Sequence, residues 1–282
     1  MRVAILVPDP DYPEDWGWAY DVEAGVLERA GIEVEARPWT GPGALADFDL
    51  VMPLVAWGYH FNAPRWHALL DRLEQEAVPT ANPVRLLRWN SDKRYLAELG
   101  ECGISVIPTR LVEALDEAAL AEARDDYGGT LVIKPPVSAA ADGTYKIGPD
   151  DPVPPSALGR TMMIQPFLPS VASEGEYSCL LFGGRFSHAI VKRPKAGDYR
   201  VQPHLGGTEA RCDAPVGSIE LAQAALAAAP AEAVYARVDM VRDEAGDLAV
   251  IELELIEPAL WLQHAPDGGE NFASAVRAAA RA

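Results

Sequence analysis

Acidic side chains recur in two strand-like runs near the end of the chain. Asp239 lies inside the run 235–241, and Glu252 and Glu254 follow in the next run with strand spacing. Residues i and i+2 of a strand face the same side, and a turn at 243–246 would fold the runs into a hairpin with the three acids together. Such carboxylates repel one another unless a cation lies between them, and oxygen-only ligation is typical of Mg²⁺. The alternative is a solvent-facing acidic strand, but glutamate is depleted in strands.

Two lysines occupy positions where an ammonium group needs an anion. Lys134 ends the apolar run 131–134, and Lys93 is expected in the first turn of a helix, where the helix dipole disfavours a cation. Taken singly, each is explained as a surface lysine. Together with a magnesium site they describe a cradle for a nucleoside triphosphate. The loop 136–144 could cover phosphates with its backbone N–H groups, although the GxxxxGK[ST] pattern is absent.

Basic side chains also gather around residue 195 in a chain that has few of them. Arg193 and Arg200 flank the segment 194–199, and Gly206 and Gly207 follow. Arginine suits bidentate recognition of phosphate or carboxylate groups. Each arginine alone would be assigned to the surface, so their grouping is what suggests an anion site.

The first 90 residues must provide a scaffold for the other half of the site. Strands at 3–7, 32–36 and 50–55 alternate with helices at 19–30 and 64–76, which indicates an open parallel α/β unit. Ligands of such sheets collect at the carboxyl ends of the strands, where the loops 8–18 and 56–61 leave. The second loop holds Trp57, Tyr59 and His60. The alternatives are that the tryptophans cover the sheet edge and that His60 is a structural histidine.

In the remaining two thirds of the chain, the sequence pattern predicts further strands with a few helices between them. We expect helices at 91–100, with Ser91 as N-cap, and at 115–126 and 218–229. A short strand is expected at Val78. The expected later strands are 106–110, 131–134, 144–147, 162–165, 176–182, 185–191, 236–241 and 248–255.

Composition excludes several classes of protein. The 282 residues carry 24 Lys and Arg against 42 Asp and Glu, a formal net charge of −18, so neither nucleic acid nor an anionic membrane is expected as a partner. The cysteines, Cys102, Cys179 and Cys212, are scattered and form no CxxC pair, which indicates a reducing compartment. Without a long apolar run, we expect a cytoplasmic protein.

The order of these motifs resembles the ATP-grasp superfamily, in particular its glutathione synthetase-like and D-alanine–D-alanine ligase-like members. The resemblance spans essentially the whole chain, and eight short motifs stand in register. The matching segments are 91–93, 132–135, 164–168, Glu176 with its strand, 192–193, Arg200 with 206–207, Asp239, and 252–258. The resemblance implies an α/β (α+β) ATP-grasp fold with an N-terminal open parallel α/β domain at 1–90. Two α+β subdomains, at 91–165 and 166–282, would enclose ATP.

The resemblance also assigns roles to residues. Lys93, Lys134 and Ser138 would hold the ATP phosphates, and Arg193 and Arg200 would stabilise the transferred phosphoryl group. The adenine and ribose would be bound by Gln165, Pro166, Phe167, Leu168, Glu174 and Glu176. Asp239, Glu252 and Glu254 would carry two Mg²⁺ ions, and the substrate would be bound by Trp57, Tyr59, His60, Gly206 and Gly207. Two departures are the alanine-rich phosphate loop and Glu254, where many relatives have asparagine.

The implied activity is an ADP-forming carboxylate–amine ligase that acts on small amino-acid-like substrates through an acyl phosphate. Three alternatives stay open. The first is a ring-closing enzyme, because the segment from Glu252 to Trp261 resembles ATP-grasp enzymes of cycloserine biosynthesis. The others are a small-molecule kinase and a non-catalytic nucleotide-binding protein on the same scaffold. Whether the chain forms a homodimer is also left open.

Overall fold

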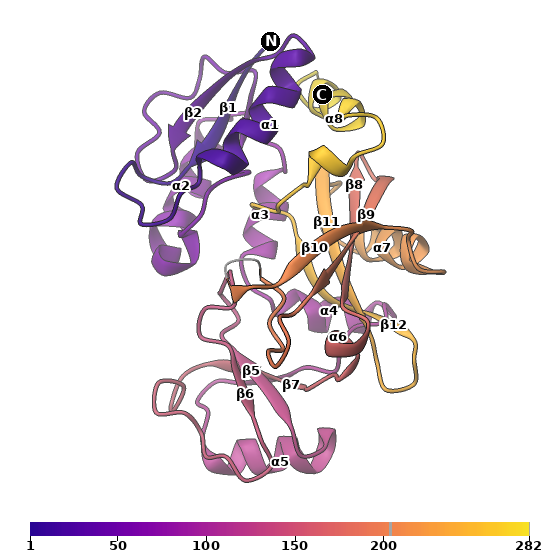
Figure 1. The fold of residues 1–282 in the computed structure, drawn as a ribbon. Helices are drawn as coiled ribbons and strands as arrows, with labels where there is room; N and C mark the ends of the chain where they lie inside the picture. Colours follow the sequence, from indigo (N-terminus) through magenta and orange to yellow (C-terminus); the bar gives the residue numbers. More distant parts are fainter. Residues whose placement is uncertain (203–204, 282) are drawn as a thin grey trace.

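The computed structural model describes residues 1–202 and 205–281, and these residues build three sheets stacked along the length of the molecule (Figure 1). The N-terminal sheet lies at the top, a five-stranded sheet in the middle and a four-stranded sheet at the bottom. This mixed α/β architecture confirms the predicted fold class.

The N-terminal sheet is parallel, with the strand order β2-β1-β3. Its strands are β1 (Arg2–Val7), β2 (Glu33–Pro38) and β3 (Leu50–Met52). Alternate residues of β1 enter two cores, one against α1 (Gly17–Arg29) and one against α2 (Ala63–Gln75). Because both faces are covered, β1 is apolar throughout, which is why its sequence predicted a buried parallel strand. The carboxyl end of β3 leads to the short helix η1 (Tyr59–Asn62).

The bottom sheet is antiparallel and has the order β4-β7-β5-β6. Its strands are β4 (Arg110–Val112), β5 (Leu131–Lys134), β6 (Tyr145–Ile147) and β7 (Met162–Pro166). Helix α5 (Glu117–Tyr127) covers one face, and Asp116 caps its first turn by accepting a hydrogen bond from the Ala119 amide.

The middle sheet is also antiparallel and has the order β10-β9-β8-β11-β12. Its strands are β8 (Glu176–Phe182), β9 (Arg185–Arg193), β10 (Thr208–Cys212), β11 (Tyr235–Arg242) and β12 (Leu248–Glu254). Three helices, α3 (Val84–Asn90), α4 (Tyr95–Glu101) and α7 (Ser218–Ala227), share a core with this sheet, and α6 (Ser170–Ser173) precedes β8. The chain then passes η3 (Leu262–His264) and ends with α8 (Glu270–Ala279), which contacts α1 at the top of Figure 1.

Several expected elements differ from the structure. Ser91 is the C-cap of α3, a helix that the sequence did not predict, and the next helix begins only at Tyr95. Lys93 therefore lies in the turn between two helices and not in a first helical turn. Val106 forms only an isolated bridge with Val250, and no strand is described at Val78. Strand β10 and helix α8 were also not predicted.

Three buried polar side chains attach the N-terminal half to β11 and β12. The Asn82 amide donates to the carbonyls of Tyr235 and Leu255 at 2.9 and 2.8 Å, and its oxygen accepts from the Val234 amide at 2.6 Å. On the free edge of β12, the Tyr95 hydroxyl bonds both the amide and the carbonyl of Leu253, at 2.9 and 3.0 Å. These bonds give partners to backbone groups that would otherwise be buried without one.

Asn90 completes this edge. Its amide donates to the Leu253 carbonyl at 2.9 Å, and its oxygen accepts from the Leu255 amide at 3.0 Å. The side chains of α3 and α4 thus take the place of a sixth strand beside β12. In the described part of the chain, no helix is long and apolar enough to cross a membrane.

Replacing Asn82 with Ala should lower the free energy of unfolding by about 3 kcal/mol, because several buried backbone groups lose their partners at about 1–3 kcal/mol each when left unsatisfied. Urea denaturation followed by fluorescence measures this change. Asn62→Ala is the matched control, since exposed Asn62 only caps α2 by accepting from the Arg65 amide. Its loss should cost about 1 kcal/mol. Equal effects of the two substitutions would contradict the role assigned to Asn82.

Candidate active site

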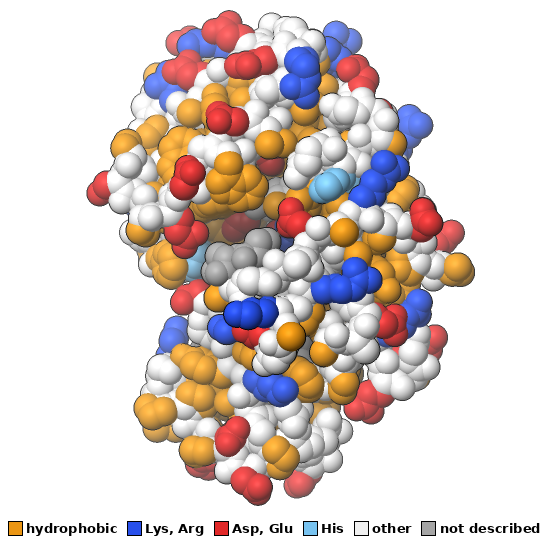
Figure 2. Space-filling model, in the orientation of Figure 1, with side chains coloured by type: hydrophobic (Ala, Val, Ile, Leu, Met, Phe, Trp, Pro, Cys, Tyr) orange, Lys and Arg blue, Asp and Glu red, His pale blue; other side chains and the backbone are white. Residues whose placement is uncertain are grey.

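One large cavity, of about 1140 Å³, lies where the three sheets meet. It is lined by both loops at the carboxyl ends of the N-terminal strands, by β5, β7 and the loop after β5, and by β11 and β12. Figure 2 shows a hollow between the upper and lower parts of the molecule, with hydrophobic and acidic side chains along its upper rim. Most of the predicted site residues line this cavity.

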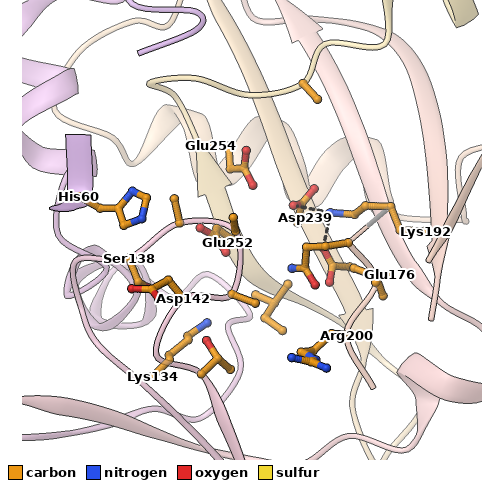
Figure 3. Close-up of a pocket in the computed structure, with 18 of the residues that line it drawn as sticks. His60, Lys134, Ser138, Asp142, Glu176, Lys192, Arg200, Asp239, Glu252 and Glu254 are labelled. Carbon is orange, nitrogen blue, oxygen red and sulfur yellow. Dashed lines mark hydrogen bonds and ion pairs between the residues drawn. The ribbon is translucent and has the colours of Figure 1, made fainter. Parts of the chain in front are cut away.

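The three predicted metal-binding acids meet on one face of the β11–β12 hairpin. Asp239 pairs directly with Glu252 in the antiparallel register, and Glu254 projects beside them (Figure 3). Each acid has a cationic partner in the protein. The Arg237 guanidinium bonds Asp239 at 3.0 Å and also pairs with Glu254, and Lys93 lies 3.2 Å from Glu252.

The surroundings of Glu254 disfavour its charged form. Burial is the largest cause and raises the pKa of the Glu254 carboxyl to about 8; the Arg237 charge opposes this rise, and the charges of Asp239 and Glu252 add to it. Burial alone would raise the pKa of Asp239, but Arg237 and Lys192 hold it below its usual value. Among residues 1–202 and 205–281, no group of three or more His, Cys, Asp or Glu side chains has metal-binding geometry, because the protein's own cations lie between the acids.

The two predicted phosphate-binding lysines are both buried but differ in their surroundings. The Lys93 ammonium donates to the carbonyl of Ser138 and pairs with Glu252. Lys134 is only 8% exposed, and its ammonium makes no hydrogen bond or ion pair with the described residues. Burial lowers its pKa. A buried ammonium without a partner, directed into a cavity, is suited to an anionic ligand.

The loop after β5 passes over the cavity and carries Ser138, which is buried beside Lys93. Ala140 and Ala141 have φ values of 51° and 62°, a left-handed conformation that favours glycine. Successive backbone N–H groups in this conformation form a concave anion-binding surface. The alanine-rich loop is therefore strained at these two residues, and its backbone has a conformation that suits phosphate binding.

The end of β7 provides an apolar slot. Gln165, Pro166, Phe167 and Leu168 all line the cavity, and the Gln165 amide is held by a 2.8 Å hydrogen bond to the Thr109 hydroxyl. The Lys146 ammonium lies 3.7 Å from the centre of the Phe167 ring. Glu176 lines the same end of the cavity, but its carboxylate pairs with Lys192.

Four predicted site residues lie outside the cavity lining. Arg193 is exposed, because it is next to Lys192 on β9 and neighbouring strand residues face opposite sides. Glu174 pairs with Arg242. Gly206 and Gly207 shape a loop: a Cβ on Gly207 would lie 2.1 Å from the Val201 carbonyl oxygen, so only glycine fits there.

Arg200 does line the cavity, opposite Lys134 in Figure 3. Its guanidinium forms a two-point contact with Asp198, at 3.1 and 2.9 Å, which fixes its orientation. The hydrogen bonds from Arg200 hold the pKa of Asp198 well below its usual range.

The opposite end of the cavity is aromatic. Trp57, Tyr59 and His60 line it as predicted, together with Tyr12 and Trp18. Gly58 has a φ of 83°, and a Cβ there would lie 2.9 Å from the Tyr12 ring, so the close approach of the two loops depends on this glycine. Burial lowers the pKa of His60 to about 4, and neither ring nitrogen has a partner among the described residues.

Three charged cavity residues were missed as site residues. Lys192 and Arg237 are buried and hold Asp239 between them, and the Arg237 guanidinium also lies 4.9 Å from the centre of the Trp261 ring. Strand alternation could have found Arg237, since it shares a face with Asp239 two residues on. Glu257 follows β12, and burial raises its pKa to about 7 against the charges of Lys93 and Arg237.

Known proteins share this arrangement over the full chain. A cycloserine biosynthesis protein, DcsG of Streptomyces lavendulae, is 33% identical over 299 aligned positions that cover 98% of each chain. The chain belongs to the ATP-grasp ligases. This ligase forms carbon–nitrogen bonds by joining a carboxylate to an amine in an ATP-dependent reaction, as the sequence predicted.

Two further comparisons agree with this assignment. Residues 4–82 of this ATP-grasp ligase match the family model of the N-terminal domain of D-cycloserine synthetase DcsG. A crystal structure of D-cycloserine synthetase DcsG superposes with a TM-score of 0.83 at 28% identity, covering 100% of this chain and 99% of that one. D-alanine–D-alanine ligase from Bacillus anthracis, at 16% identity, has the same fold with a TM-score of 0.72 over 100% and 97% of the two chains.

The two buried lysines should respond in opposite ways to replacement by methionine. Lys134→Met removes an ammonium without a partner, so the nucleotide-free protein should gain about 1–3 kcal/mol in unfolding free energy while its affinity for ATP falls. Lys192→Met, the matched control, leaves Glu176 and Asp239 buried without their partner and should cost about 3–5 kcal/mol. Urea denaturation and calorimetric titration with ATP measure these changes. A loss of stability in Lys134→Met would contradict the account of Lys134.

Proposed function

We propose that this protein is a ring-closing synthetase of the D-cycloserine type, in which ATP activates a carboxylate that is then captured by a nitrogen of the same molecule. The match of residues 4–82 to the N-terminal domain of D-cycloserine synthetase carries the proposal. ATP-grasp enzymes share their nucleotide-binding parts, whereas this segment contains both aromatic loops of the substrate end. The relative that spans 98% of both chains adds support.

ATP would extend from the β7 end of the cavity to its centre. The segment 165–168 and Glu176 would bind the adenosine, and Lys93, Lys134 and the backbone around Ser138 would bind the phosphates. The buried Lys134 ammonium supports this assignment, because a phosphate would provide the partner that it lacks. Glu174 and Arg193 are not included, since neither lines the cavity.

Magnesium fits the acidic face of the hairpin by the chemistry of its donors. Glu252 and Glu254 are carboxylates on one strand face, each with a single cationic partner, and burial raises the pKa of Glu254. Together with Asp239 and the ATP phosphates they would hold two Mg²⁺ ions. When bound, Mg²⁺ would neutralise charge on the phosphates. Oxygen-rich ligation of this kind is typical of Mg²⁺ in nucleotide sites.

The reaction would proceed in two balanced steps. An oxygen of the substrate carboxylate attacks the γ-phosphorus, the bond to the β-phosphate oxygen breaks, and ADP leaves. The substrate nitrogen then attacks the acyl carbon, loses a proton, and expels phosphate as the ring closes. Arg237 and Arg200 would offset the charge on the transferring phosphoryl group and on the acyl phosphate. The aromatic wall would exclude water, which would otherwise hydrolyse the acyl phosphate.

The division into units of 1–90, 91–165 and 166–282 is also proposed, supported by a separate sheet in each unit. Helix α8 shows one limit of this division, because it belongs to the last unit in sequence but contacts α1 of the first. Small carboxylate and amine groups are the expected reactants. The cytoplasmic location and the question of a homodimer stay at the level of the sequence predictions.

Mass spectrometry of products tests the proposed function. The wild-type protein, given Mg-ATP and a panel of β-aminooxy-D-alanine and its N-substituted derivatives, should release ADP and phosphate and form a cyclic product. Glu252→Gln should still bind ATP, since both phosphate lysines remain, but should lose at least about 100-fold in turnover. A linear amide that requires an added amine would indicate the two-substrate ligase, and a stable phosphorylated product would indicate a kinase. ATP binding without turnover over the panel would contradict the proposal.

A further inference from the structure

Glu257 is an acidic residue at the substrate end of the cavity that the proposed chemistry does not use. It lies in the segment that leaves β12, beyond the metal-binding acids, and it lines the cavity. Glu252 and Glu254 pair with Lys93 and Arg237, whereas the Glu257 carboxylate makes no ion pair or side-chain hydrogen bond within the described residues. The charges of Lys93 and Arg237 act on it, but both cations already pair with other acids, so the Glu257 carboxylate has no cationic partner of its own.

Glu257 shares the lining of the cavity with Tyr12, Trp18, Trp57 and Tyr59 of the N-terminal loops. Burial raises the pKa of the Tyr59 phenol, and the charge of Glu257 is the next largest cause of this rise. The charge of Glu257 also helps to raise the pKa of the Tyr12 phenol. The rings of Trp18 and Trp57 lie 5.8 Å apart in the same wall. Aromatic faces attract cations, so this wall and the carboxylate favour the same kind of group.

The charges along the cavity give it a direction. Lys134 and Arg200 lie in the lower part of the cavity in Figure 3, and Lys93 lines it beside Glu252; these cations suit phosphates and a substrate carboxylate. An amino acid whose carboxylate faces these cations must place its ammonium group elsewhere. Glu14, Asp15 and Asp142 also line the cavity, but all three are exposed, and Asp15 already accepts a hydrogen bond from the Gly17 amide. Glu209 lines it from β10, whereas Glu257 belongs to the segment that follows the acidic face of β12. Glu257 is therefore the acid that we assign to the ammonium group.

We propose that Glu257 binds the α-ammonium group of the amino-acid substrate and of its cyclic product, and so selects for molecules with a free amino group. The inference rests on the proposed function, since it takes the substrate carboxylate to lie at the phosphate end. Charge complementarity would then orient the substrate, with the ammonium toward Glu257 and the carboxylate toward ATP.

Calorimetric titration of the ADP-bound, full-length protein with D-cycloserine tests this role. Isoxazolidin-3-one, the same ring without the amino group, is the second probe. Glu257→Gln should weaken the binding of D-cycloserine about 10- to 100-fold, the range expected for a charge-assisted hydrogen bond, and should leave the binding of isoxazolidin-3-one unchanged. Glu14→Gln, a matched change at an exposed acid of the same cavity, should alter neither affinity more than about twofold. Unchanged ADP affinity in both variants shows that they are folded.

The outcomes separate the two proposals. If the wild-type protein and Glu257→Gln bind D-cycloserine with equal affinity, the role of Glu257 is overturned and the proposed function stands. A large effect of Glu14→Gln with none of Glu257→Gln would overturn it as well, by assigning the ammonium to the exposed acid. Wild-type protein that binds ADP but not D-cycloserine would contradict the proposed function, and the inference that rests on it.

Discussion

At Leu253 and Leu255 the outer edge of β12 is completed by side chains and not by another strand, and the position of the acidic residues of β12 depends on these hydrogen bonds. Asn90 and Tyr95 bond the backbone of Leu253 and Leu255, the residues that alternate with the acids of β12. Because strand neighbours face opposite sides, fixing the leucines in the core fixes Glu252 and Glu254 toward the cavity. Helices α3 and α4, which carry these side chains, also lie on either side of Lys93. One set of buried hydrogen bonds therefore positions Lys93, the proposed phosphate-binding lysine, together with the acids proposed to bind metal.

The cavity is lined by charged side chains, some of which are paired within the protein and some of which are not. Asp239 is neutralised by Arg237 and Lys192, and these contacts stabilise the sheet around it. Buried Lys134 and half-buried Glu257 both line the cavity and have no such partner among the described residues. Unpaired charges removed from water are unfavourable for folding, so their presence in a ligand-sized cavity is best explained by ligands of opposite charge. The net charge of −18 excluded polyanionic partners, but the few cations gathered here are suited to a small phosphate compound.

The sequence predicted those parts of the site that depend on local pattern. The hairpin that joins Asp239 to Glu252 followed from strand alternation and a turn at 243–246, and the structure has this register. Lys134 was found because a charge ends an apolar strand. Arg193 was predicted at the phosphoryl group but does not line the cavity, because two adjacent residues of β9 cannot both enter it and the sequence did not show that Lys192 does. Serine is a common N-cap residue, but Ser91 caps the carboxyl end of α3. Its hydroxyl accepts a hydrogen bond from the Trp66 indole at 2.8 Å and donates one to the Leu87 carbonyl. Contacts between distant segments, such as that of α8 with α1, leave no local signal in the sequence.

We propose that this cavity converts a carboxylate into an acyl phosphate that a nitrogen then captures. In the most direct measurement, the enzyme turns over a substrate whose carboxylate oxygens carry ¹⁸O, and the released phosphate is analysed by ³¹P NMR. The acyl phosphate pathway transfers one carboxylate oxygen to phosphate, so one ¹⁸O per phosphate is predicted at full enrichment. Phosphate that contains no label would show that the carboxylate never bonded to phosphorus, and would contradict the account.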